Sequence, residues 1–348
     1  MRAPAHCKCH RQGGLSLVEL LIAMTAGLLL IVATAATYIN SKGLFRVGQS
    51  VSNIQENGRF ALEVLTHDLR LAGFSGCAGT SGMTNLINSP GAFLTNFTMG
   101  IQGFDASGNA WQPTLDAAIT AGTAVAPTPG TDVITVRRPE GPAFGLSAPW
   151  MVNATDNPHA DASTVRQAGL QSGHFVLLAD CGGGAMFQIS NGDVQGTGNL
   201  FHATLGTPGN SSASLGKIFG PDALAMRMVT ASYFVAPSQI LPGNNSLWVR
   251  MGSDTPAELA AGVDNLQITY GEDTDGDLTA NRYATADQVG DMTNVVSVRI
   301  SLLMRSLEDN VAQAPQAYRF NGASPVTPSD RRLRVVLTTV VNLRNRTP

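Results

Sequence analysis

A short acidic segment holds the residues best suited to binding a metal ion. The sequence Gly-Glu-Asp-Thr-Asp-Gly-Asp, which ends at Asp277, places four carboxylates within six residues. Asp273, Asp275 and Asp277 have the alternate spacing of a calcium-binding loop. The match to an EF-hand loop is incomplete, because Leu278 stands where that loop needs glycine and Ala284 where it needs glutamate. Two interpretations stay open: a Ca²⁺ site, or a solvated turn rich in Asp and Gly.

A single carboxylate lies inside a long apolar segment near the N-terminus. Residues 15–39 contain one charged residue, Glu19, and are long enough to span a bilayer as a helix. A charge at that depth costs several kcal/mol unless it finds a partner or reaches the interface. An ordinary signal peptide cut near Ala35 is the alternative, but the apolar run is too long for one. The basic residues that precede the segment favour a cytoplasmic N-terminus.

Four cysteines fall into two groups. Cys7 and Cys9 stand between two histidines in the basic N-terminal stretch, where no further ligands follow at a useful spacing for a metal site. Cys77 and Cys181 remain. In an exported domain two such distant cysteines are expected to form one disulfide, and the alternative is two buried free thiols.

Catalytic motifs are missing from the sequence. His67 and Asp68 are adjacent and could suggest an acid–base pair, but no nucleophile stands in a recognisable motif nearby. We find no Gly-x-Ser-x-Gly, no His-Glu-x-x-His and no phosphate-binding loop. The sequence therefore favours a solvated helix face at this pair and a protein that is not an enzyme. A net charge of −3 gives no reason to expect a nucleic-acid partner.

A second helical pattern follows the apolar segment. In residues 50–72, apolar side chains recur at spacings of three, four and seven, which predicts an amphipathic helix. It continues the apolar helix with at most a short break, and together they would reach about 85 Å. Gly73 is the expected stop.

The remainder of the chain predicts a β-rich body. Its 37 glycines and 18 prolines, with β-branched runs between them, are typical of strands joined by turns. The fold class is therefore α+β, with one helix laid on an antiparallel sheet. Residues 78–130 and 140–170 are expected to be long loops. The strands are expected at Asp132–Arg138, Gly173–Leu178, Ala185–Ser190, Val229–Ala236, Ser246–Met251, Asp264–Tyr270, Val295–Arg305 and Arg331–Arg344.

The N-terminal motif resembles the processing site of type IV prepilins. A glycine, Gly14, is followed by Leu-Ser-Leu-Val-Glu-Leu-Leu, and Glu19 is the fifth residue counted from Leu15. In that family a dedicated peptidase cuts after the glycine and methylates the new N-terminus. The resemblance implies cleavage at Gly14, methylation of Leu15, and a role for Glu19 in neutralising a neighbouring subunit's amine during assembly. Leucine at the new N-terminus departs from the commoner phenylalanine.

Further segments resemble the PilW family in particular, among them Glu56–Leu62, His67–Phe74 and the ending at residues 330–346. This resemblance implies a type IV pilin-like fold and a minor pilin at the pilus tip or in the priming complex. It implies as partners the prepilin peptidase, other minor pilins, the major pilin and a large tip adhesin. The nearest alternative is a minor pseudopilin of a type II secretion system, and the distant one a membrane-anchored periplasmic enzyme.

The expected organisation follows from these segments. A leader occupies residues 1–14, an inner-membrane helix residues 15–39 and an amphipathic continuation residues 40–73. One periplasmic β-rich domain fills residues 74–348. The protein is expected to cross the bacterial inner membrane once, with a cytoplasmic N-terminus, before it enters the pilus.

Overall fold

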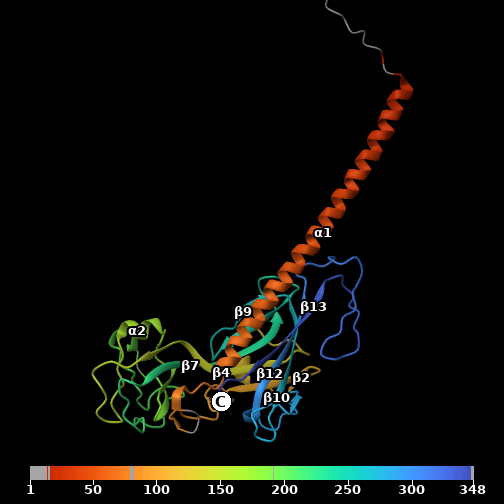
Figure 1. Ribbon diagram of the computed structural model, residues 1–348. Helices are drawn as coiled ribbons and strands as arrows, with labels where there is room; N and C mark the ends of the chain where they lie inside the picture. Colours follow the sequence, from red (N-terminus) through yellow and green to blue (C-terminus); the bar gives the residue numbers. More distant parts are fainter. Residues whose placement is uncertain (1–13, 15, 79–81, 191, 346–348) are drawn as a thin grey trace, which may run out of the picture.

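The computed structural model describes residues 14, 16–78, 82–190 and 192–345. It consists of a long helix that projects from a β-rich body (Figure 1). Most of the expected leader, including Cys7 and Cys9, and the expected cleavage product's first residue, Leu15, lie outside the described residues.

The helix α1 runs from Leu17 to Leu71 as one 55-residue element, a length of about 83 Å. Ser16 caps its start, since the Ser16 hydroxyl accepts a hydrogen bond from the Glu19 N–H at 3.2 Å. The helix ends before Gly73, which has a φ of +67°. The side-chain amide of Asn345 donates to two carbonyls at that end, those of Arg70 at 3.3 Å and Ala72 at 3.1 Å. The C-terminal end of the described chain therefore lies against the C-terminal end of α1.

The larger sheet has nine strands in the order β1-β6-β5-β7-β4-β2-β3, and β8 and β9 extend it beside β7. Its described pairings are antiparallel except for the short parallel pair of β1 with β6. The strands are β1 (Met83–Asn85), β2 (Ile101–Ser107), β3 (Ala110–Gln112), β4 (Val133–Gly145), β5 (Phe175–Asp180), β6 (Gly183–Gln188), β7 (Leu224–Pro237), β8 (Asn245–Met251) and β9 (Ala257–Ala261).

The smaller sheet has four antiparallel strands in the order β11-β10-β12-β13. Short helices and helical turns lie in the connections between the other elements. The strands are β10 (Val263–Glu272), β11 (Arg282–Ala284), β12 (Val295–Arg305) and β13 (Arg334–Asn342). The turns are η1 (Gly76–Ala78), η2 (Ala117–Ile119), α2 (Ala162–Gln167), α3 (Val194–Thr197) and η3 (Met292–Asn294).

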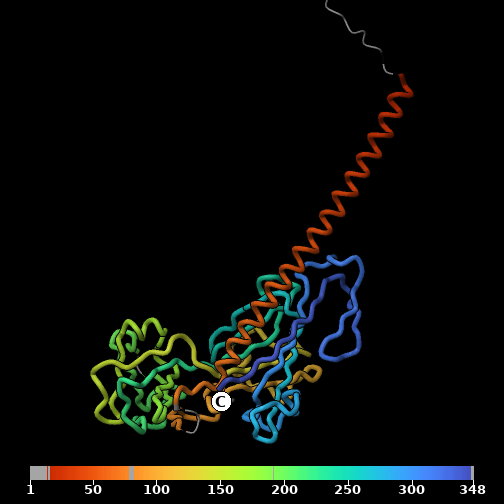
Figure 2. The backbone as a smooth tube through the Cα atoms, viewed as in Figure 1, coloured from red at the N-terminus to blue at the C-terminus, as the bar shows by residue number. Residues whose placement is uncertain are grey.

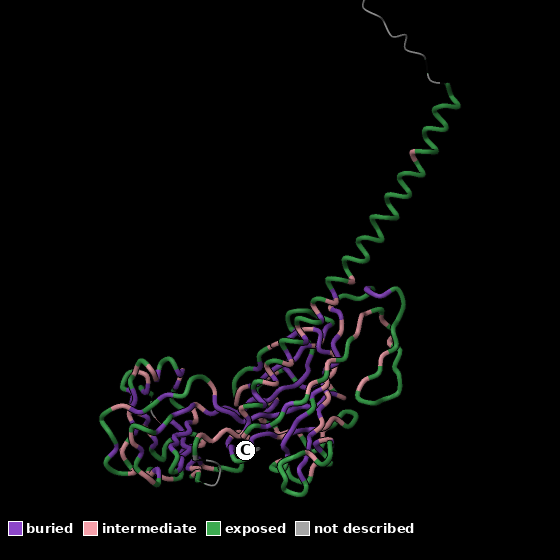
Figure 3. Tube along the Cα trace, in the orientation of Figure 1, coloured by how far each residue is buried: buried purple, intermediate pink, exposed green. Residues whose placement is uncertain are grey.

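The main hydrophobic core lies between the second half of α1 and both sheets. Ile54 and Leu65 of α1 pack with apolar side chains of β4, β7, β10, β12 and β13. A second core, which includes Phe187 and Phe219, fills the lobe around α2. Figure 2 follows the chain into this lobe and back, and the last strand then returns along α1. In Figure 3 the body half of α1 carries buried residues, whereas the other half is exposed.

The α+β class is confirmed, with one long helix packed on an antiparallel-rich β body. The expectation of structureless segments was wrong in part, because β1, β2 and β3 lie within residues 78–130 and β4 runs on to Gly145. Residues 140–170 also contain α2. These elements are short or irregular, so their stability comes from neighbouring strands rather than from a local pattern that can be read in isolation.

Candidate functional site

The expected processing and assembly residues lie at the free end of α1. Glu19 is exposed in the first helical turn, and Gly14 is exposed just before it. The apolar residues that follow are exposed too, for example Leu29 at 72%. Among the described residues, α1 is the one helix long and apolar enough to cross a membrane. The roles of Gly14, Leu15 and Glu19 stay predictions.

A buried ionic cluster holds the other end of α1 to the body. Asp68 is 2% exposed, and its carboxylate lies 2.6 Å from the Arg138 Nε of β4. The same carboxylate accepts a hydrogen bond from the Tyr233 hydroxyl of β7. Burial and the negative charge of Asp68 raise the pKa of the Tyr233 phenol, so this hydroxyl stays protonated and donates. One carboxylate thus joins α1 to two neighbouring strands.

The expectation of a solvated helix face at His67 and Asp68 was therefore half wrong. The His67 side chain is 70% exposed and its ring nitrogen lies 3.1 Å from Asp68, but Asp68 itself points into the body. The position of Asp68 in the helical repeat already indicated that its side chain is buried. Asp68 follows Ala61 by seven residues and Leu65 by three, so it belongs to the buried stripe of the helix.

A disulfide fixes the chain just beyond α1. Cys77 in η1 is bonded to Cys181, which follows β5, and their Cα atoms are 4.7 Å apart. Beside it, the Lys217 ammonium contacts both carboxylate oxygens of Asp180, at 2.6 and 2.8 Å. The bridge closes a loop of 104 residues, which in the chain-entropy model stabilises the body by roughly 4–5 kcal/mol.

The acidic loop follows β10 and brings its carboxylates together. Oxygens of Asp273, Asp275 and Asp277 lie within 4.8 Å of one another. Asp273 accepts backbone hydrogen bonds from Gly276 at 2.7 Å and Leu278 at 2.9 Å, so much of its hydrogen-bonding capacity is used inside the loop. Leu278 has a φ of +67°, the left-handed conformation that glycine usually supplies in a calcium loop. Both earlier interpretations stay open, and the Ca²⁺ site stays a prediction.

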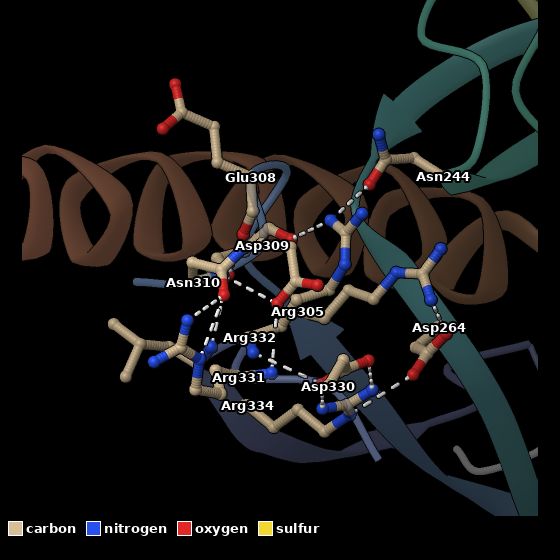
Figure 4. A network of polar contacts seen from close by, with 12 residues as sticks. Asn244, Asp264, Arg305, Glu308, Asp309, Asn310, Asp330, Arg331, Arg332 and Arg334 are labelled. Atoms are coloured by element: carbon tan, nitrogen blue, oxygen red, sulfur yellow. Dashed lines mark hydrogen bonds and ion pairs between the residues drawn. The ribbon is translucent and has the colours of Figure 1, made fainter. Parts of the chain in front are cut away.

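An arginine-rich network fixes the start of β13 (Figure 4). Arg334 contacts Asp330 at 2.7 Å and Asp264 at 3.4 Å, and Arg305 reaches Asp264 at 3.0 Å. Hydrogen bonds from Arg334, with help from Arg332, lower the pKa of Asp330 to about 2. The Asp330 carboxylate therefore remains charged, and its contacts with Arg334 fix where β13 begins.

The same network anchors the excursion of residues 306–333 between β12 and β13. The Arg332 guanidinium donates to the carbonyls of Ser306 at 2.7 Å and Leu307 at 2.6 Å. Next to them, Glu308 forms an ion pair with Arg46 of α1 at 3.0 Å. The excursion is thus tied both to the sheet and to the helix.

The strands of this C-terminal part can be compared with known families. Residues 232–345 match the PilW family model, Type IV Pilus-assembly protein W. The PilW match includes β8 to β13, the acidic loop and the arginine network. The helix α1, the disulfide and the lobe around α2 lie outside it. A pilus-assembly family indicates a structural protein that works with other pilus components.

Beyond the PilW match, a comparison with solved structures finds a type IV-like pilin from Thermus thermophilus. That pilin is 10% identical, with 84% of this chain and 98% of that chain covered and a TM-score of 0.29. At this score the likeness carries no argument. No curated protein matches the chain.

Proposed function

We propose that the protein is a minor pilin of a type IV pilus, built in at or near the tip or in the complex that primes assembly. One observation carries the proposal. A prepilin-type motif at Gly14–Glu19 opens a single helix whose first half is exposed and apolar and whose second half is packed into the body. The PilW match of the C-terminal strands supports it.

Before assembly, the apolar half of α1 would lie in the bacterial inner membrane, with the N-terminus in the cytoplasm and the body in the periplasm. Prepilin peptidase would cut after Gly14 and methylate Leu15. The disulfide between Cys77 and Cys181 suits an oxidising compartment such as the periplasm. Other minor pilins, the major pilin and a tip adhesin would be its later partners.

Glu19 would take part in assembly. It is the one acid in the apolar half of α1, and in the sequence it is the fifth residue counted from the expected new amino terminus. In a bundle of such helices, a carboxylate from one subunit and an amine from the next would neutralise each other in a low-dielectric setting. Pairing of this kind makes the buried charge tolerable and fixes the axial position of the subunits.

Intact mass spectrometry of membrane and sheared-pilus fractions tests the proposal. We expect a chain that begins at methylated Leu15 and occurs in both fractions. Glu19→Ala should be cut normally, but its share in pili should fall about tenfold or more, the effect of losing about 1.4 kcal/mol per subunit. Glu56→Ala removes an exposed carboxylate from the other half of α1 and serves as the matched control.

Two kinds of result would contradict the proposal. A chain that is cut near Ala35, or that is uncut and confined to membranes, would contradict the minor-pilin assignment. Normal incorporation of the Glu19→Ala protein would contradict the pairing of charges while leaving the processing step in place.

A further inference from the structure

The strand β13 is an unusually long open edge for a sheet in a soluble body. It ends the four-stranded sheet and spans nine residues, Arg334–Asn342. In the described part of the chain, the other strands at sheet edges, β1, β3, β9 and β11, have three to five residues. The pairing of β13 with β12 has no bulge, and β13 contains no proline and no lysine. The edge of β13 is therefore not protected by shortness, a bulge, a proline or a lysine.

The register shows which backbone groups point outward. The Leu343 N–H donates to the Val296 carbonyl of β12 at 2.9 Å, and the pairing continues unbroken along β13. In an antiparallel ladder, alternate residues bond to the neighbouring strand, so the odd-numbered residues of β13 face β12. The N–H and C=O groups of Val336, Thr338 and Val340 consequently face away from the sheet.

A groove runs beside this edge. Its wall is the stripe of α1 from Gln55 to Leu71, and Leu337 of β13 lies at its other side. It has a volume of ≈ 840 Å³. Two half-buried leucines of α1, Leu62 and Leu71, line it together with Leu337. At the edge, Val336 is 38% and Val340 48% exposed. A strand laid against β13 would thus find apolar surface for its alternate side chains.

The charges around the edge favour an acidic occupant. The groove is lined by two arginines, Arg59 and Arg70, and by a single carboxylate, that of Glu63. Arg344 is exposed just after β13. A second copy is a poor occupant, because antiparallel pairing centred on Thr338 would set Arg344 of each copy opposite Arg332 of the other. In parallel pairing in register, each arginine would lie beside the same arginine of the other copy, and the two like charges would repel.

We propose that the free edge of β13 and the adjoining groove form a docking site for an extended segment of another polypeptide. This segment is apolar at alternate residues and acidic at its ends, and it adds a fifth strand to the sheet. Main-chain hydrogen bonds to Val336, Thr338 and Val340 supply the affinity, and the groove and its arginines select the sequence. The inference rests on the body alone and does not depend on the pilin assignment.

The test uses the full-length protein in detergent micelles and a synthetic peptide. The probe is a fluorescent peptide, acetyl-Glu-Val-Thr-Val-Thr-Val-Thr-Glu-amide, with its threonines N-methylated. The methyl groups replace the N–H groups along one edge of the extended peptide, so that only the edge of the valines can pair with β13. We expect a dissociation constant of about 10 μM by anisotropy, within the range of single-segment recognition. Hydrogen exchange should slow about tenfold or more at the outward amides of β13. A peptide with lysine ends should bind about tenfold more weakly.

Two variants separate strand addition from other modes of binding. Val340→Pro removes one outward N–H without removing a bond to β12 and should abolish binding. Val340→Thr keeps that N–H and the branched side chain and should bind like the parent. A peptide N-methylated at its valines instead should fail to bind the unaltered protein, a result that requires no folded variant.

Several outcomes would overturn the proposal. These are no binding at about 1 mM peptide, protection of amides elsewhere, or equal binding by Val340→Pro or by the valine-methylated peptide. Equal affinity for the lysine-ended peptide would overturn the acidic nature of the partner. A dimer that forms through β13 and excludes the peptide would assign the edge to a second copy.

Discussion

Replacing Asp68 by asparagine should weaken the attachment of α1 to the body. The substitution keeps the size of the side chain and one acceptor oxygen, so the Tyr233 hydroxyl can still donate. It removes the negative charge 2.6 Å from the Arg138 Nε, and the Arg138 side chain is 8% exposed. Asp68→Asn therefore leaves a buried guanidinium without its ionic partner.

The expected loss follows from that burial. Breaking a buried ion pair by removing one partner costs about 3–5 kcal/mol, and we expect about 3 kcal/mol because the asparagine keeps part of the hydrogen bonding. Domains are stable by about 5–15 kcal/mol, so this is a large share. With a urea dependence of about 3 kcal/mol per molar, the unfolding midpoint should fall by about 1 M.

Urea unfolding of the full-length protein in detergent measures this shift, with fluorescence of the buried Trp248 as the reporter. Glu63→Gln neutralises an exposed carboxylate on the same helix and should change stability by less than about 0.5 kcal/mol. Asp68→Asn should leave the apolar half of α1 helical, because no described contact of Asp68 reaches it.

A double-mutant cycle decides whether the pair is responsible. Arg138→Met should also destabilise, but the combined Asp68→Asn, Arg138→Met protein should lose about 2 kcal/mol less than the sum of the single losses. A coupling below about 0.5 kcal/mol, or an unchanged midpoint for Asp68→Asn, would refute the reasoning that this ion pair holds α1 to the body.

Three further perturbations probe other parts of the body. Cys77→Ser should cost roughly 4–5 kcal/mol of stability, and a melting temperature unaffected by the mutation or by reductant would count against the disulfide. Burial raises the pKa of Asp132 from 3.8 to about 7, so the folded state holds this proton more tightly. Its stabilisation of about 4 kcal/mol is full below about pH 4 and is lost as pH rises through about 7. From pH 5 to 8 the urea midpoint of the parent should fall relative to that of Asp132→Asn, and equal slopes would contradict this. A side chain at Gly103 would collide with the Tyr270 hydroxyl, so Gly103→Val should destabilise the fold by about 1–3 kcal/mol. Adding Tyr270→Phe removes that hydroxyl and should restore part of the lost stability. If the stability changes of the two single variants simply add in the double variant, the collision is not the cause.

The helix was the part of the fold most accessible from sequence. The apolar run and the periodicity after residue 50 predicted an element that ends at Leu71, because helical contacts are local and leave a repeating pattern. All eight expected strands overlap observed strands, and the two richest in β-branched residues, Val295–Arg305 and Arg331–Arg344, gave the clearest patterns. The strands missed were β1, β2, β3, β9 and β11, which acquire a strand conformation from their neighbours.

The contacts of the candidate site were harder to foresee. The place of Asp68 in the buried stripe could have been read from its spacing, but its partner Arg138 is 70 residues away and leaves no local trace. The open edge of β13 was not predictable either. Its alternating, β-branched sequence resembles that of a central strand, and only the sheet order shows that one side is unpaired.

The contact between Asn345 and the C-terminal end of α1 has a consequence for how the protein is made. The helix α1 is synthesised first, yet its last carbonyls receive hydrogen bonds from Asn345, and its apolar stripe packs on β12 and β13. The hydrogen bonds from Asn345 span about 270 residues, so the helix cannot be completely covered until nearly the whole chain has been synthesised. Throughout that interval the apolar side chains of Ile54 and Leu65 are not fully covered, and exposed apolar surface favours aggregation. The emerging chain therefore needs a holding partner, a role that a chaperone or the lipid surface beside its own anchor can fill.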